Sequence, residues 1–127
     1  MISTPGTTIS QQCLTDAIDD ETVGPWVDVR GRANIVFYQS STGTTSGGVI
    51  TFEEAAPKNC AVDATTNGVF GAATGDYASI TTSNASDTSA AKQKSVHLDA
   101  KGYCFVRARV STAIIGGGSV SVCCIAY

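Results

Sequence analysis

The chain has 127 residues, of which 43% are hydrophobic and 15% charged, and its formal net charge is −3. A chain of this length most often forms one domain that buries enough surface to fold without disulfides or metal ions. Its 8 basic residues are scattered, which argues against a nucleic-acid partner, and no apolar run approaches the roughly 20 residues of a membrane-spanning helix.

The first 21 residues differ from the rest of the chain. Pro5 and Gly6, with neighbouring Ser and Thr, favour an extended chain, and Gln11–Ile18 fits either one helical turn or a short strand. The sequence therefore predicts an N-terminal arm at 1–21 and a single domain at 22–127. An arm of this kind becomes ordered when it docks on a partner. The start also lacks the pattern of a secretory signal, which predicts synthesis in the cytoplasm without export.

From Val23 onward, alternating apolar residues and many Thr, Val and Ile predict strands separated by turns. The segment 40–48 is predicted to be a flexible turn, and 57–94 a long excursion with weak patterning. This pattern predicts an all-β fold, a two-sheet antiparallel sandwich of jelly-roll type. The predicted strands are 26–29, 32–39, 48–54, 95–98, 103–111 and 119–127, with weaker candidates at 69–70 and 77–82.

The last two strands are predicted to pair as a β-hairpin across the glycines at 116–118. In both strands one face is small and apolar, because side chains alternate between the two faces of a strand. These apolar faces are predicted to point into the core. Their members are Cys104, Val106, Ala108, Val110, Val120, Val122, Cys124 and Ala126.

The 5 cysteines cannot all pair within one chain. Cys104, and at least one of Cys123 and Cys124, occupy apolar strand positions, where a free cysteine behaves as a small hydrophobic residue. Together with synthesis in the cytoplasm, this predicts reduced, buried thiols. The alternative is a bridge from Cys104 to Cys123 or Cys124.

Residues with catalytic or metal-binding chemistry are not spaced for it. His97 is the only histidine, and the cysteines lack the C-x-x-C spacing of a zinc site. Glu53 and Glu54 are adjacent on a strand and point to opposite faces, whereas two catalytic carboxylates must converge on one bond. The sequence predicts a protein that is not an enzyme and that has no cofactor.

Aromatic residues and arginines on the outward face of 103–111 combine residue types that are enriched at protein interfaces. The open alternative is that a second layer covers the aromatic rings, with arginine stems lying over them. Trp26 fits equally a contact residue and a plug at the rim of the core. The predicted contact residues, including the apolar residues of the arm, are Ile9, Leu14, Ile18, Trp26, Tyr103, Phe105, Arg107 and Arg109.

The segments 26–29, 34–38, 48–54 and 96–111, with the Gly-rich turn and Val120-Ser-Val122 after them, resemble small β-sandwich proteins of tailed bacteriophages. The closest in kind are capsid decoration, or cement, proteins. The resemblance covers roughly residues 22–127 and lies in strand patterning, size and Gly/Ser/Thr/Ala-rich composition.

That resemblance implies a structural virion protein, made in the host cytoplasm and bound to the outer surface of the phage head. Its partners would be the major capsid protein and other copies of itself, most often in a trimer and sometimes in a dimer. The alternative is a carbohydrate- or receptor-binding module of a tail fibre. There the excursion at 57–94 and an aromatic residue such as Tyr38 or Tyr77 would form the site.

Overall fold

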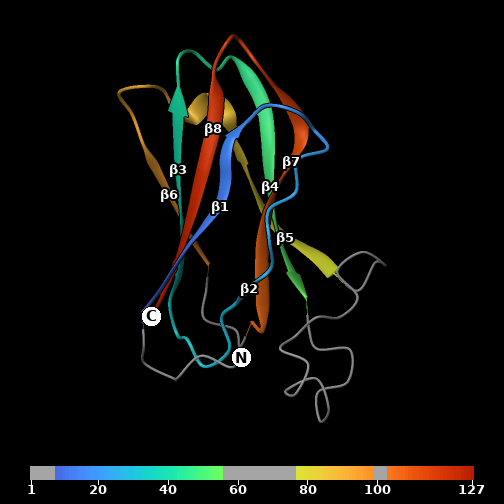
Figure 1. Ribbon diagram of the computed structural model, residues 1–127, viewed down its shortest axis with the longest axis vertical. Coiled ribbons are helices and arrows are strands. Elements are labelled where there is room, and N and C mark those ends of the chain that lie inside the picture. Colours follow the sequence, from blue (N-terminus) through green and yellow to red (C-terminus); the bar gives the residue numbers. More distant parts are fainter. Residues whose placement is uncertain (1–7, 56–76, 99–102) are drawn as a thin grey trace.

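The computed structural model describes residues 8–55, 77–98 and 103–127, and these residues form an all-β structure (Figure 1). The predicted strand at 69–70, the turn at 100–102 and Cys60 lie outside the described residues. In chain order the elements are β1 (Ile9–Ala17), β2 (Val27–Asp28), β3 (Ile35–Thr42), β4 (Gly47–Ala55), β5 (Tyr77–Asn84), the 3-10 turn η1 (Ala85–Asp87), β6 (Lys94–Leu98), β7 (Phe105–Ile115) and β8 (Ser119–Ala126).

The strands form two antiparallel sheets of four strands, in the orders β1-β8-β3-β6 and β2-β7-β4-β5. Each of the pairs β1·β8, β2·β7, β3·β6 and β4·β5 is hydrogen-bonded. The chain therefore folds as one long hairpin whose paired strands alternate between the two sheets. This nesting is the jelly-roll topology of eight strands, which confirms the fold predicted from the sequence.

The core lies between the sheets and is filled by side chains from both. Val106, Ala108 and Val110 of β7 point inward and are completely buried, as their alternation predicted. Across the sandwich, the rings of Phe37 in β3 and Phe52 in β4 are 4.5 Å apart between centroids. The inward residues of β8 are equally buried: Val120, Val122, Cys124 and Ala126.

Buried polar residues gather near η1, which lies at the upper end of the sandwich in Figure 1. Gln39 is completely buried and donates hydrogen bonds to the Asn84 carbonyl at 3.1 Å and to Thr88 Oγ1 at 3.0 Å. Its own Oε1 accepts a hydrogen bond from Ser83 Oγ at 2.7 Å. These bonds satisfy polar groups at inward positions. β3 continues to Thr42, three residues into the segment predicted as a turn.

The predicted C-terminal hairpin is wrong. β7 and β8 are consecutive in the chain, but they belong to different sheets and face each other across the core. β7 pairs with β2 and β4, and β8 pairs with β1 and β3. Residues 116–118 form an arch, in which a Cβ on Gly118 would clash with the Thr42 carbonyl oxygen. Alternation correctly predicted which faces of β7 and β8 are buried. It could not predict the pairing, because two strands with buried faces can be hydrogen-bonded in one sheet or can face each other from two sheets.

The predicted N-terminal arm is also wrong as a separate unit. Ile9–Ala17 is extended, but it forms strand β1 at the edge of a sheet, paired with β8. Its inward residues Cys13, Leu14 and Ala17 are part of the main core. The segment that follows is hydrogen-bonded to β7, through Ile114 N to the Ile18 carbonyl at 2.8 Å and Val110 N to the Thr22 carbonyl at 2.9 Å. Residue 22 is therefore not a domain boundary.

Candidate functional site

The structure separates the eight predicted contact residues into three sets. Leu14 is 2% exposed in the core, and Ile9 and Tyr103 pack against that core, so these three residues stabilise the fold. Ile18 is 50% exposed at the end of β1. The other four gather on or beside the outer face of the sheet β2-β7-β4-β5. They are Trp26, Phe105, Arg107 and Arg109.

Arg107 is the centre of a tightly connected group that we call the Arg107 cluster: Trp26, Glu53, Tyr77, Arg107 and Arg109. Glu53 in β4 lies opposite Arg107 in β7, and the Arg107 Nε to Glu53 Oε1 distance is 2.8 Å. Arg109 Nε is 2.7 Å from the other carboxylate oxygen, Oε2. The guanidinium carbon of Arg107 lies 4.3 Å from the centroid of the Trp26 ring and 4.5 Å from that of Tyr77.

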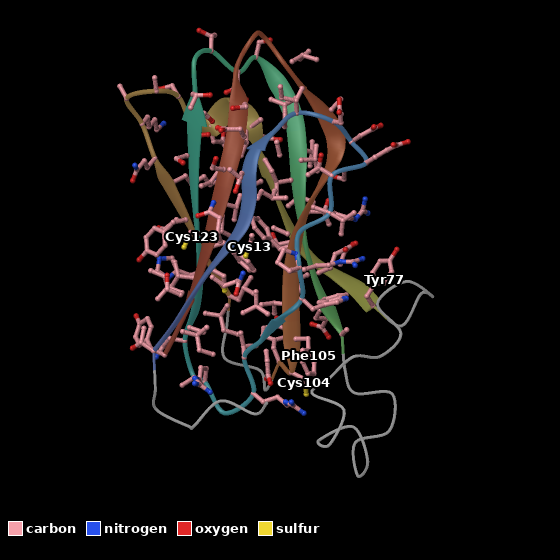
Figure 2. The ribbon with its side chains drawn as sticks, viewed as in Figure 1. Cys13, Tyr77, Cys104, Phe105 and Cys123 are labelled. Atoms are coloured by element: carbon pink, nitrogen blue, oxygen red, sulfur yellow. The ribbon has the colours of Figure 1, made fainter. Side chains whose placement is uncertain are left out.

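Burial gives this cluster its electrostatic character. Glu53 is completely buried and its single carboxylate faces the guanidinium groups of Arg107 and Arg109. The Arg107 side chain is 9% exposed, whereas that of Arg109 is 31% exposed. Tyr77, at the start of β5, is 37% exposed and points away from the sandwich in Figure 2. The cluster therefore offers a surface partner an aromatic ring and part of a fixed guanidinium group.

Phe105 lies lower on the same sheet, near the start of β7 (Figure 2). It is 2% exposed and packs with Ala55, Trp26 and Cys104 in a small cluster separate from the main core. The Arg30 guanidinium lies 4.8 Å from the centroid of its ring and also pairs with Asp28 at 2.9 Å. Phe105 therefore packs with Trp26 on this face, and the Arg30 guanidinium lies over its ring.

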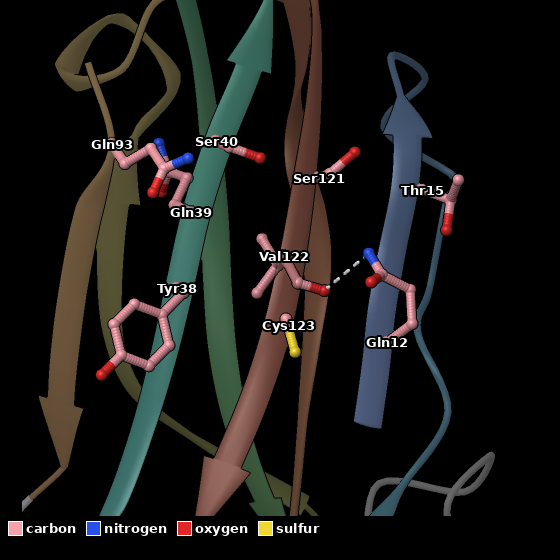
Figure 3. Close-up of a pocket in the computed structure, with 9 residues that line it drawn as sticks. All are labelled: Gln12, Thr15, Tyr38, Gln39, Ser40, Gln93, Ser121, Val122 and Cys123. Atoms are coloured by element: carbon pink, nitrogen blue, oxygen red, sulfur yellow. Dashed lines mark hydrogen bonds between the residues drawn. The ribbon is translucent and has the colours of Figure 1, made fainter. Parts of the chain in front are cut away.

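The opposite outer face, that of the sheet β1-β8-β3-β6, carries a shallow pocket that the sequence did not predict (Figure 3). Its volume is about 470 Å³. Alternation along β3 and β8 places four of the lining residues on an outer face: Tyr38, Ser40, Ser121 and Cys123. Only the observed strand register brings them beside β1. The lining residues are Gln12, Thr15, Tyr38, Gln39, Ser40, Gln93, Ser121, Val122 and Cys123.

The described cysteines, Cys13, Cys104, Cys123 and Cys124, are all free thiols. The alternative bridge from Cys104 to Cys123 or Cys124 is absent, because Cys104 leads into β7 and the other two lie in β8 of the opposite sheet. Cys13 and Cys124 are buried, while Cys104 and Cys123 are half-buried. A hydrogen bond with Cys13, together with burial, raises the pKa of the Cys124 thiol, which makes it a poor nucleophile.

His97 is exposed on β6, with its Nε2 3.3 Å from Ser95 Oγ. Among residues 8–55, 77–98 and 103–127, no three His, Cys, Asp or Glu side chains are grouped so that they could hold a metal ion. No helix in that same part of the chain is long and apolar enough to cross a membrane. The lack of a cofactor and of enzyme activity stays a prediction.

The fold and these surfaces define a jelly-roll protein whose core is packed with side chains and whose candidate sites lie on its two outer faces. Comparisons with protein-family models, curated proteins and solved structures found no match to this chain. The Arg107 cluster and the pocket are the two surface features of the described residues that bear on function.

Proposed function

We propose that this chain is a structural virion protein, a capsid decoration protein that binds the outer surface of a phage head and stabilises contacts between major capsid proteins. The observation that carries the proposal is the Arg107 cluster on the outer face of β2-β7-β4-β5. Trp, Tyr and Arg are the residues most enriched among those that dominate protein–protein binding energy. Here all three types meet at one place on a sheet.

The rigidity of the cluster supports a docking role. The Arg107 guanidinium is held by Glu53 and stacked on two rings. Arg109 is fixed by the second oxygen of the same carboxylate. Side chains that are already fixed lose little conformational entropy when a partner binds. The Arg109 side chain is 31% exposed, so its guanidinium group can donate to a partner surface that presents carboxylates or carbonyl oxygens.

The fold is compatible with this role. Jelly rolls are common in viral capsid proteins and in lectins. The packed core in the described part of this chain leaves its surfaces as the place for recognition. A decoration protein is present in many copies on a regular lattice, so modest affinity at each site becomes strong attachment when the copies associate as trimers or dimers.

The test is co-sedimentation of the purified protein with expanded, undecorated heads of the phage that encodes it. We expect saturable binding at a fixed ratio to the major capsid protein. The substitution Arg109→Gln, which leaves the Glu53–Arg107 pair intact, should weaken binding by about tenfold. The matched control is Ser95→Ala, an exposed change on the opposite sheet, which should bind like the wild type.

Two further measurements complete this test. Melting curves of the variants show whether Arg109→Gln is folded, and Tyr77→Ala provides a second variant of the same cluster. The mass of the free protein in solution reports whether it is a trimer or a dimer. Absence of wild-type binding to the heads would refute the proposed function. Unchanged binding by both folded variants would refute the role of the Arg107 cluster.

A further inference from the structure

We propose that the pocket on the outer face of β1-β8-β3-β6 binds a neutral saccharide. None of its nine lining residues is Asp, Glu, Lys, Arg or His. The side chains of Gln39 and Val122 point into the core, and the other seven residues supply two amides, three hydroxyls, one thiol and one exposed aromatic ring. A volume of about 470 Å³ lies within the usual range of small-molecule sites. This proposal does not depend on the proposed function, because it concerns the opposite sheet.

Several polar groups of the pocket are available to a ligand. No described residue forms a hydrogen bond with the side chains of Thr15, Ser40 or Gln93. Gln12 donates through Nε2 to the carbonyls of Leu14 at 2.6 Å and Val122 at 3.3 Å, which fixes its amide and leaves Oε1 as an acceptor. Sugar hydroxyls both donate and accept, so they match a neutral set of amides and hydroxyls.

Tyr38 supplies the apolar surface that a saccharide also needs. It is 44% exposed and projects from β3 on one side of β8, while Gln12 lies on the other side (Figure 3). The pocket therefore runs across neighbouring strands, with an aromatic ring at one end and a fixed amide at the other. The C–H face of a pyranose ring can lie against Tyr38 while its hydroxyl groups reach the amides.

The charges beside the pocket differ in sign: Lys92 and Lys94 flank Gln93, and an aspartate lies near Ser121. Asp16 lies beside Ser121, because its backbone N–H donates to Ser121 Oγ at 3.0 Å and its carboxylate accepts from Ser119 Oγ at 3.2 Å. The lining residues themselves offer a phosphate, sulfate or carboxylate no cation. The neutral lining therefore fits a neutral saccharide better than a nucleotide or a sialylated sugar.

The two proposed surfaces can be occupied together. Cys123, which lines the pocket, and Tyr77, which belongs to the Arg107 cluster, lie on opposite sides of the sandwich in Figure 2. A copy attached to a head through the Arg107 cluster would present the pocket outward. Saccharide binding and capsid binding can consequently be tested separately, and either can fail alone.

The test is saturation-transfer NMR of the full chain with lactose, maltotriose, cellotriose and N,N′-diacetylchitobiose, and with sialyllactose as the charged comparison. We expect transfer to at least one neutral sugar and weaker transfer to sialyllactose. Tyr38→Ala should reduce affinity by about tenfold, the loss of one good ring contact. The matched control is Tyr127→Ala, because Tyr127 is also an exposed tyrosine, at 52%, but does not line the pocket.

Gln93→Ala is the second variant, chosen because Gln93 is exposed and lies before β6, so it keeps the test valid if Tyr38→Ala does not fold. Alkylation by iodoacetamide then locates the ligand, since a bound sugar should slow modification of Cys123 several-fold. Transfer to none of the neutral sugars would overturn the proposal, as would a preference for sialyllactose. Binding that is equal in all folded variants, or that leaves Cys123 unprotected, would overturn it as well.

Discussion

At the scale of the residue, Glu53 is the feature on which the outer face of β2-β7-β4-β5 depends. A carboxylate with no exposed surface is stable only when charged partners compensate for its lost hydration, and Arg107 and Arg109 do so through separate oxygens. Trp26 differs from this pattern. Its Nε1 is buried and has no hydrogen-bond acceptor among the described residues.

Replacing Glu53 should therefore destabilise the fold strongly. Glu53→Gln removes the charge that two guanidinium groups face, and we expect a loss of about 3 kcal/mol in the free energy of unfolding. Urea denaturation followed by tryptophan fluorescence measures it. The control is Glu54→Gln, one residue along, where the side chain is half-buried and forms no ion pair with any described residue. A loss as small as that of the control would mean that the ion pairs contribute little.

A second residue-scale prediction concerns pH. The hydrogen bond from Lys94 lowers the pKa of Asp87, at an N–O distance of 2.6 Å. A lowered folded pKa means that this pair stabilises the protein above the unfolded pKa of about 3.9, and that the contribution is lost as pH falls through the folded value. Both side chains are more than one-third exposed, so the effect is small.

Asp87→Asn should consequently cost about 0.5 kcal/mol at neutral pH and nothing in strong acid, where the wild-type carboxyl is protonated. Thermal melting of both proteins across the acid range measures the difference. A difference that stays constant from neutral to acidic pH would mean that Asp87 acts through packing and not through charge.

At the scale of the element, strand β1 is where sequence and structure differ most. Pro5 and Gly6, with neighbouring Ser and Thr, predict an extended arm that becomes ordered on a partner. Its apolar residues Cys13, Leu14 and Ala17 instead bury themselves in the chain's own core. The sequence pattern could not distinguish these outcomes, because Leu14 would be apolar in either case. What distinguishes a core strand from a free arm is the pairing of β1 with β8, which lies far along the chain.

Deletion of residues 1–21 should therefore abolish folding and not merely capsid binding. Leu14→Ala tests the same strand more gently, with an expected loss of about 3 kcal/mol for a buried leucine. The neighbouring exposed change Gln11→Ala should stay within about 0.5 kcal/mol of the wild type. Circular dichroism and thermal melting report both. A truncated protein that melts cooperatively like the wild type would show that β1 is dispensable.

At the scale of the whole molecule, the sequence predicts which residues are buried better than it predicts which strands are paired. Val106 and Val122 were correctly assigned to a core because burial is visible as alternation along one strand. Whether their strands are hydrogen-bonded or stacked depends on partners distant in sequence, which alternation does not encode. The same limit hid the pocket, since Gln12, Cys123 and Tyr38 become neighbours only through the registers β1·β8 and β3·β8.

The nested pairing also determines the order of events during synthesis. Strand β8 lies between β1 and β3, and Ile9 is paired with Ala126. The first described strand must therefore remain without its partner until nearly the whole described chain has emerged from the ribosome. Folds dominated by such distant pairings form slowly. Until the partner strand is available, the unpaired edges of the early strands promote aggregation. Rapid chain elongation, or a chaperone that covers β1, would then matter more to the yield of this protein than the stability of its finished fold.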